Sequence, residues 1–442
     1  RNHPLGHRTM RVPRAVKRLA GALCVAIIAA PAPVAAQQTV ALLPDLPGDP
    51  LDADGVVPPL RSAPPPPEMR LREAVAALQR GEWRRALKRT DALIAARPDF
   101  RAAHFLRGEI LAGRSGVRPE ILLAGHGDAL GALAEETRLR IAPLPTDADA
   151  GLRPAPLLRL PPSVEHALLV DLSAARLFVV SRDGSGLRVT RDLYAAMGSA
   201  GFGKQVEGDN RTPIGVYRIE SWIDGGELPD LYGSGAYPVD YPNEWDRHRE
   251  RTGHGIWLHG VPGDTYARLP RSSEGCVTMA NDDLEGLDPM VTTGNTPVIL
   301  AERIEWLPPA TIEARTARFE QRVEDWRRAW MSGDTDALMA FYAPDFSDGT
   351  RDRDAFEAHK RAVSRDKEWI EIAVSDLAIY EYPGEENLRL VSFHQRYSSD
   401  TYASHSVKRQ YWRLQPDGHW RIERSFERDE RPITASAGIG GQ

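Results

Sequence analysis

The spacing of the apolar residues changes twice along this chain, and each change limits what that part can fold into. Apolar residues recur at helical spacing from Met69, alternate as in strands from Val164, and return to helical spacing near Ala310. Proline-rich stretches at 42–67 and 141–162 precede the first two segments, and such a composition favours extended linkers. Because 442 residues are too many for one ordinary core, we predict a multidomain α+β protein with an N-terminal helical repeat-like module, a β-rich domain and a C-terminal α+β cone.

The predicted boundaries follow these changes in composition and period. We expect upstream sequence and a signal peptide over 1–36, a Pro-rich linker over 37–68, the helical module over 69–140, a second linker over 141–162, the β-rich domain over 163–304, the cone over 310–428 and a tail over 429–442.

The N-terminal segment is typical of a secretory signal peptide. Met10 is followed by a basic segment, an apolar stretch over 19–30 and small residues that end at Ala36. We expect cleavage after Ala36, which would leave a periplasmic protein without an integral membrane span. Lipid anchoring at Cys24 is the alternative, although Leu23 fits a lipoprotein cleavage site poorly.

Charge and composition argue against several classes of function. The net charge of −6 is mild, and both signs are mixed along the chain. No basic tract or zinc-finger spacing suggests a nucleic-acid partner. No Cys or His pair has ligand spacing with a third ligand nearby, so we expect neither a metal nor another cofactor.

The helical module resembles one and a half tetratricopeptide repeats. A first helix ends at the turn Gly81-Glu82-Trp83, Pro98 precedes a third helix, and a further helix is expected over 128–140. Such a unit cannot bury its apolar face alone, so it must pack on another domain or on a second copy of the chain. A homodimer is therefore one expectation.

The β-rich domain is predicted to open with a hairpin and to continue through short strands. The expected strands are 167–172, 176–180, 187–194, 215–222, 255–258 and 296–300. The stretch 231–247 has no clear periodicity, which suggests a functional lid or loop.

The last segment combines helices with long alternating strands. Phe319, Val323, Trp326 and Trp330 share one helical face. A second helix is expected over 337–342, followed by strands at 370–380, 388–397, 404–415 and 420–426. This pattern resembles the SnoaL-like cone fold related to nuclear transport factors, whose core would include Trp326, Trp330, Trp412 and Trp420. That fold implies a pocket but no particular activity.

One cysteine remains after the predicted signal peptide, and its surroundings indicate a nucleophile. Cys276 lies in the run Ser273-Glu274-Gly275-Cys276. A lone thiol in an exported protein has no disulfide partner, so its reactivity is the better reason for its presence. His259 ends a predicted buried strand and is placed to act as the base for Cys276. The Gly275-Cys276 peptide is a natural oxyanion donor because glycine permits close backbone approach.

These motifs together resemble the L,D-transpeptidase (YkuD) family. The resemblance covers about 164–300 and rests on His259-Gly260, on Ser273-x-Gly275-Cys276, on Met197-Gly198 and on the block 208–217. It implies that Cys276 is the nucleophile and His259 the base. It further implies that the Gly260 carbonyl orients the imidazole, and that Ser273, Gly275 and Cys276 shape the oxyanion pocket. The expected substrate is a peptidoglycan stem peptide, attacked before its terminal D-alanine through an acyl-enzyme.

The chain departs from the usual motif, and several alternatives stay open. Glu274 stands where the family usually has His, and Thr278 stands where Asn or Arg is common. Glu274 could repel stem carboxylates, select a positive amine or merely face solvent. Arg211 could bind a carboxylate or stabilise its turn. The 231–247 insert and the cone resemble a branch that includes cell-shape L,D-carboxypeptidases, so the activity could be L,D-transpeptidase, L,D-carboxypeptidase or both.

Two further readings remain. A relative in the same branch acts as an amidase that releases wall-anchored lipoprotein, and a catalytically silent wall-binding scaffold is the reading from a different class. The presence of both Cys276 and His259 favours an enzyme.

Overall fold

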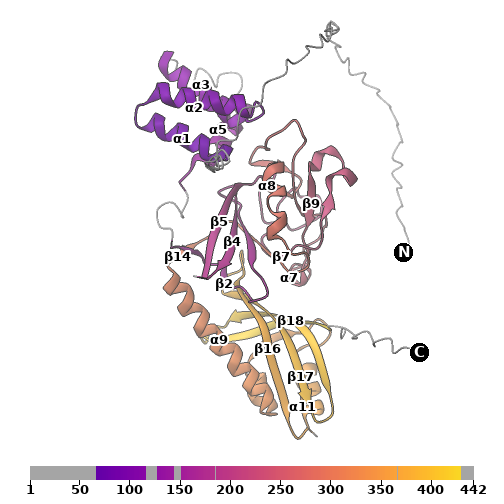
Figure 1. Cartoon of the computed structure of the whole chain (residues 1–442). Coiled ribbons are helices and arrows are strands. Elements are labelled where there is room, and N and C mark those ends of the chain that lie inside the picture. Colours follow the sequence, from indigo (N-terminus) through magenta and orange to yellow (C-terminus); the bar gives the residue numbers. More distant parts are fainter. Residues whose placement is uncertain (1–65, 116–126, 144–150, 185, 366, 430–442) are drawn as a thin grey trace, which may run out of the picture. The chain divides into compact units, whose positions relative to one another are not determined.

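The computed structural model describes residues 66–115, 127–143, 151–184, 186–365 and 367–429 (Figure 1). The expected signal peptide, nearly all of the first linker and nearly all of the C-terminal tail lie outside the described residues.

Helices α1 (Pro67–Gln79), α2 (Trp83–Ala96), α3 (Arg101–Ser115) and α5 (Gly127–Ile141) form the N-terminal module (Figure 1). Small and aliphatic side chains on their facing sides are buried, among them Leu71, Ala74, Ala86, Leu93 and Leu106. The Trp83 ring packs beneath the Arg114 guanidinium of α3, 4.0 Å from its centroid. The predicted helix–turn–helix pattern is therefore confirmed, and Trp83 serves helix packing.

The module also contacts the β-rich domain. Phe100 packs on Tyr266 with ring centroids 4.5 Å apart, and Arg101 donates a hydrogen bond of 2.6 Å to the carbonyl of Ala267. The sequence left two partners open for the apolar face of the helical module, another domain or a second copy of the chain. The structure shows contacts with another domain, the β-rich one.

The β-rich domain contains a five-stranded sheet in the order β5-β4-β3-β13-β7. Its strands are β3 (His166–Asp171), β4 (Arg176–Asp183), β5 (Gly186–Tyr194), β7 (Gly215–Arg218) and β13 (Pro297–Ala301). β3 and β4 form the predicted hairpin, and β13 runs parallel to β3 and antiparallel to β7. Both faces of β3 and β13 are covered, which explains their nearly continuous apolar sequence.

A second, smaller sheet has the order β12-β10-β9-β8. Its strands are β8 (Ile223–Asp224), β9 (Gly235–Pro238), β10 (Trp257–His259) and β12 (Val277–Thr278). Nearby lie the two-stranded pair β6 (Met197–Gly198) and β11 (Arg271–Ser273), the helices α7 (Glu244–His248) and α8 (Asn281–Glu285), and the 3-10 turns η1 (Gly225–Glu227), η2 (Asp230–Tyr232) and η3 (Asp288–Met290).

Two expectations for this region need correction. The stretch 231–247 is not irregular throughout, because β9 pairs with β10 and Asn243 begins α7 with a capping box. β9 has only four residues, too few to show a period of its own. The strand expected over 215–222 ends at Arg218. The strand expected over 255–258 begins only at Trp257, and His259 ends it as expected.

The C-terminal cone is a long helix laid on a curved sheet (Figure 1). The helix is α9 (Pro309–Met331), and the sheet order is β15-β19-β18-β17-β16-β2. The elements are β2 (Leu157–Arg159), α10 (Thr335–Met339), β15 (Tyr342–Ser347), α11 (Arg353–Ser364), β16 (Ile370–Glu381), β17 (Leu388–Ser399), β18 (Ala403–Leu414) and β19 (Trp420–Asp429). Trp326, Trp330 and Trp412 are buried in its core, and Trp420 packs against that core as predicted.

Three details of the cone differ from expectation. The second helix ends at Met339, and Tyr342 instead begins β15, which pairs with Ile422 of β19. Helix α11 was not anticipated, although Asp352 caps it by accepting from the Ala355 N–H. The range 141–162, assigned to a linker, contains β2 paired with β16, and β1 (Arg153–Pro154) paired with β14 (Trp306–Leu307).

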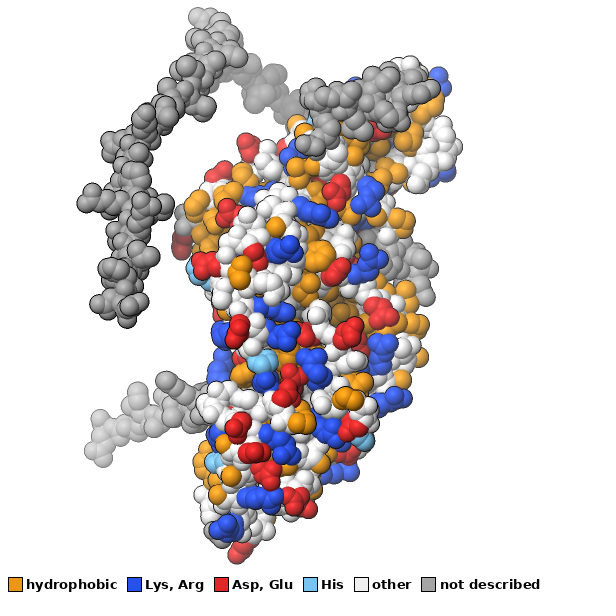
Figure 2. Space-filling view, turned by 180° about the vertical axis from the view of Figure 1, so that it is seen from behind, with side chains coloured by type: hydrophobic (Ala, Val, Ile, Leu, Met, Phe, Trp, Pro, Cys, Tyr) orange, Lys and Arg blue, Asp and Glu red, His pale blue; other side chains and the backbone are white. Residues whose placement is uncertain are grey.

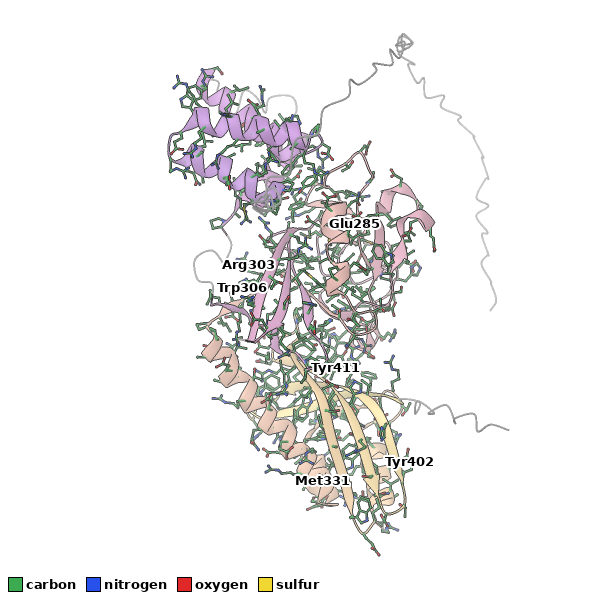
Figure 3. The ribbon with its side chains drawn as sticks, in the orientation of Figure 1. Glu285, Arg303, Trp306, Met331, Tyr402 and Tyr411 are labelled. Carbon is green, nitrogen blue, oxygen red and sulfur yellow. The ribbon has the colours of Figure 1, made fainter. Side chains whose placement is uncertain are left out.

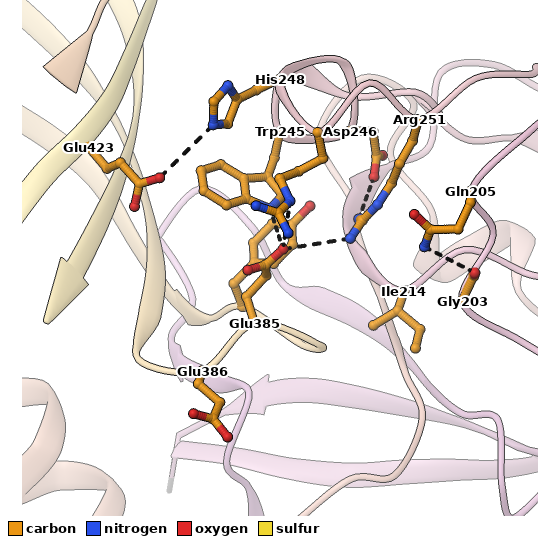
Figure 4. Close-up of polar contacts among 12 residues, drawn as sticks. Gly203, Gln205, Ile214, Trp245, Asp246, His248, Arg251, Glu385, Glu386 and Glu423 are labelled. Atoms are coloured by element: carbon orange, nitrogen blue, oxygen red, sulfur yellow. Dashed lines mark hydrogen bonds and ion pairs between the residues drawn. The ribbon is translucent and has the colours of Figure 1, made fainter. Parts of the chain in front are cut away.

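Helix α7 joins the β-rich domain to the cone through one buried tryptophan. Trp245 stacks on Tyr411 of β18 at 5.0 Å and 24°, and its indole N–H donates to Glu385 at 3.1 Å (Figure 4). Arg251 pairs with both Asp246 and Glu385, at 3.0 and 3.6 Å (Figure 4). Figure 3 shows Tyr411 near the β-rich domain and Tyr402 at the far end of the same hairpin.

The surface shows no single sign of charge on the face drawn in Figure 2, where basic and acidic side chains are interspersed. Among the described residues, no helix combines the length and apolarity that a membrane span requires.

Replacing Trp245 by alanine should destabilise the protein strongly, because it removes a fully buried ring from the contact with the cone. We expect a loss of about 3–5 kcal/mol, measured as a lower thermal or urea midpoint. Trp369, whose side chain is 48% exposed, is the matched control, and Trp369→Ala should leave the midpoint nearly unchanged. Equal losses in the two variants would contradict this assignment.

Candidate active site

The parallel pairing of β10 with β12 brings the two predicted reactive residues together. Leu258 pairs with Val277, and His259 pairs with Thr278. Cys276 precedes Thr278 by two positions, so strand alternation places its side chain on the same face as His259. Residues seventeen positions apart in sequence thus meet on one face of the small sheet.

His259 is held in a single orientation. Its Nδ1 lies 2.8 Å from the carbonyl oxygen of Gly260. Because a carbonyl can only accept, Nδ1 carries the proton and the neutral ring keeps a lone pair on Nε2. Burial lowers the pKa of His259 to about 4; the Gly260 hydrogen bond opposes this shift and the charge of Arg268 adds to it. At neutral pH the imidazole is therefore uncharged and able to accept a proton.

Cys276 is partly exposed and its thiol is protonated in the resting state. Burial of the sulfur raises the pKa of Cys276, while a hydrogen bond from the Trp257 backbone and the charge of Arg268 oppose that shift. The thiol donates to the carbonyl of Gly255 at 3.4 Å. Glu274 is exposed beside it, and its negative charge raises the pKa of Cys276 further. The lowered pKa of His259 and the raised pKa of Cys276 both favour the neutral forms, an uncharged imidazole and a protonated thiol.

Ser273 shapes the turn that carries the cysteine. Its hydroxyl donates to the Cys276 carbonyl at 2.6 Å and accepts from the Gly275 N–H at 3.2 Å. The N–H of Gly275 is thus engaged within the turn. Gly275 has φ +132°, and a Cβ there would lie 2.9 Å from the Arg211 carbonyl oxygen. This position therefore requires glycine.

Arg211 belongs to a rigid turn behind the cysteine motif. Its exposed guanidinium donates to the Phe202 carbonyl at 3.0 Å. Asp209 organises the turn, since it accepts from the Arg211 N–H at 3.1 Å and pairs with Lys204 at 2.8 Å. Burial raises the pKa of Asp209, but the bonds from Lys204 and the backbone outweigh this and lower it to about 2.

Asn281 fixes the loop that follows His259. The amide oxygen accepts from the N–H groups of Val261 at 3.0 Å and Ser234 at 3.1 Å. The amide nitrogen donates to the Val261 carbonyl at 2.8 Å. A Cβ on Gly260 would collide with the amide oxygen of Asn281. Asn281 therefore holds in place the Gly260 carbonyl that orients the imidazole.

Tyr232 and Arg268 complete the surroundings of His259. The Tyr232 ring meets the imidazole edge-on with centroids 4.9 Å apart. Arg268 donates to the carbonyl of the neighbouring Leu231 at 3.0 Å. Neither residue was singled out individually from the sequence. Tyr232 lies in the stretch 231–247, which was expected as a functional lid or loop without naming this residue, and Arg268 belongs to a loop without a motif. The same holds for Asn281, for which the only signal is its place at the start of α8.

The cone contains a separate pocket of about 530 Å³ that is open to solvent on one side. Trp330, Tyr397 and Gln395 line it, together with Lys360, whose ammonium lies 4.0 Å from the Trp330 ring centroid. Burial lowers the pKa of Lys360 to about 7, and the nearby charge of Lys408 adds to this shift. The predicted pocket of this fold is therefore present. Among the described residues, no group of three or more His, Cys, Asp or Glu side chains could hold a metal ion.

Comparison with known proteins identifies two of the domains. Residues 165–300 match the L,D-transpeptidase catalytic domain (YkuD), and residues 318–424 match the Cds6 C-terminal NTF2-like domain. No curated protein matches the chain significantly.

Two solved structures resemble both domains together. Bd1075 of Bdellovibrio bacteriovorus is 28% identical over 64% of this chain and 99% of its own, with a TM-score of 0.57. The helical cell shape determining protein Pgp2 of Campylobacter jejuni is 26% identical over 59% of this chain and 91% of its own, with a TM-score of 0.51. The chain therefore carries a YkuD-family L,D-transpeptidase catalytic domain followed by a C-terminal NTF2-like domain.

Proposed function

We propose that this protein is an exported cysteine enzyme that removes the terminal D-alanine from peptidoglycan stem tetrapeptides, acting as an L,D-carboxypeptidase. The observation that carries the proposal is the pairing of β10 with β12, whose register places the Cys276 side chain on the same face of the small sheet as the His259 imidazole. The Nδ1 of that imidazole donates to the Gly260 carbonyl. The signal-like segment before Ala36 supports export.

In the first step, Nε2 of His259 accepts the thiol proton as the sulfur attacks the carbonyl carbon of the diamino acid. Concerted transfer suits a pair that is neutral at rest, since no thiolate has to persist in the partly buried site. The negative charge that develops on the carbonyl oxygen needs a donor. The Cys276 N–H is the candidate, because the Gly275 N–H already bonds to Ser273.

The imidazolium then gives its proton to the leaving amine, and D-alanine departs. The acyl-enzyme holds the diamino acid as a thioester on Cys276. Water, deprotonated by His259, attacks this thioester, so that the thiol is restored and a tripeptide stem is released. An amine in place of water would give a transpeptidation product. Hydrolysis is supported by the resemblance of the 231–247 insert and the cone to a branch that includes cell-shape L,D-carboxypeptidases. The similarity to the helical cell shape determining protein Pgp2, which covers 91% of that chain, agrees with a place in this branch.

Digestion of a purified disaccharide tetrapeptide in H₂¹⁸O, with and without a free D-amino acid, tests this function. The wild type should release D-alanine and a tripeptide carrying one ¹⁸O, and Cys276→Ala should lose activity by at least about 10³-fold. Mass spectrometry of the products reads both results. Exchange with the D-amino acid in place of ¹⁸O uptake would show a transpeptidase, and no Cys276-dependent product would contradict the proposal.

Asn281→Ala should lower kcat/KM by about 10- to 100-fold, because a small displacement of the imidazole spoils its alignment. The fold should survive, since the hydrogen bonds lost are local. Asn295→Ala, on an exposed turn, is the control and should keep full activity. Unchanged activity in Asn281→Ala would show that the imidazole does not depend on this amide.

The low pKa of His259 should make the fold acid-sensitive. The unfolded chain binds the proton with an ordinary pKa near 6.5 and the folded chain with a pKa of about 4. Stability is therefore lost as the pH falls from 6.5 towards 4. Between pH 7 and 4.5 the wild type should lose about 2 kcal/mol more than His259→Gln, measured by urea unfolding. Equal losses of stability in the wild type and in His259→Gln would show that the proton taken up on unfolding binds to another group than His259.

A further inference from the structure

We propose that Arg268 binds the C-terminal carboxylate of the D-alanine that is cleaved off, and so restricts the enzyme to stems that end one residue beyond the scissile bond. This inference rests on the proposed function and names the part of the substrate that the site recognises.

Arg268 is a cation without an anionic partner. Among the described residues, its guanidinium forms no ion pair; it makes a hydrogen bond of 3.0 Å to the Leu231 carbonyl. The side chain is half-buried. One hydrogen bond leaves most of the five guanidinium N–H donors unused, and a planar fork of this kind matches a carboxylate. The site therefore holds spare positive charge at its rim.

The backbone of this residue is fixed from two sides. The Tyr194 hydroxyl donates to the Arg268 carbonyl at 3.1 Å, and Arg101 of α3 donates to the preceding carbonyl, that of Ala267, at 2.6 Å. Tyr194 is in turn covered by the buried Arg140 guanidinium, 3.6 Å from its ring centroid. A residue held this firmly is preorganised to bind, since little further ordering is needed.

The position of Arg268 points to the leaving residue. Its guanidinium binds next to Tyr232, whose ring touches the His259 imidazole, and its charge acts on both His259 and Cys276. His259 must reach the leaving amine in order to protonate it. In D-alanine the carboxylate carbon is only roughly 2.5 Å from that amine nitrogen, across one Cα. The carboxylate nearest the imidazole is therefore that of the leaving residue.

Other nearby arginines fit this role less well. Arg211 lies on the turn behind Gly275 and bonds to the Phe202 carbonyl. Arg271 faces Glu135 at 3.8 Å. A pentapeptide stem has an amide where the tetrapeptide has its terminal carboxylate, so a bound pentapeptide would leave Arg268 without an anionic partner.

The test compares the tetrapeptide acid with the same compound carrying a C-terminal carboxamide. Binding is measured in Cys276→Ala, which cannot turn over, and kcat/KM in the active enzyme. With Arg268 present, the acid should be preferred over the amide by about 10- to 100-fold in both measurements. Arg268→Gln should abolish that preference by weakening the acid alone, and Arg268→Lys should restore part of it. Arg247→Gln is the matched control, because it removes the same charge from an exposed position on α7. This variant should keep the full preference for the acid.

Several results would overturn the assignment. Equal weakening of acid and amide by Arg268→Gln would show that the residue only holds the Tyr232 loop. Loss of the preference in Arg211→Gln instead, or a preference that follows amidation of the diamino acid, would move the carboxylate site elsewhere. If the protein binds the acid more tightly than the amide but cleaves neither, the role of Arg268 as carboxylate site is upheld and the proposed reaction is refuted. If it binds neither compound, both proposals are refuted.

Discussion

The parallel pairing of β10 with β12 is the contact on which the rest of the site depends. It aligns His259 with Thr278 and thereby fixes where Cys276 stands. Parallel strands need a crossover, and here residues 260–276 supply it. That same crossover carries Arg268 past the imidazole. The pairing itself is only two residues long, so neighbouring elements must stabilise it: β9 on the other side of β10, and Asn281 at the start of α8.

The helical module supports this crossover from outside the catalytic domain. Phe100 and Arg101 hold Tyr266 and Ala267, and Arg97 forms an ion pair with Asp282 of α8. Arg140 is fully buried between the module and the domain, where it pairs with Glu136 at 2.8 Å. A buried ion pair of this kind is strongly destabilising to break, because the remaining charge has no solvent. The module thus supports the loops that surround Cys276 and His259.

Most of the architecture could be predicted from the sequence, because long elements show a clear period. The α9 face of Phe319, Val323 and Trp326 and the cone strands β16 to β19 are examples. Some short elements could not be predicted: β9 has too few residues for a pattern, and β2 pairs with a strand more than two hundred residues away. The strand that ends at His259 was expected from its apolar residues, and β10 confirms it with a later start. Cys276 and His259 stood out by residue type and motif. Asn281, Tyr232 and Arg268 did not, since their importance comes from contacts between distant loops.

Intact-protein mass spectrometry of an acid-quenched reaction tests the central claim most directly, because it looks for the covalent bond itself. We expect the wild type, mixed with excess disaccharide tetrapeptide, to gain the mass of the substrate minus D-alanine. Peptide mapping should place the adduct on Cys276, and Cys276→Ala should show none. An adduct on another residue, or tripeptide formed by Cys276→Ala, would contradict the account.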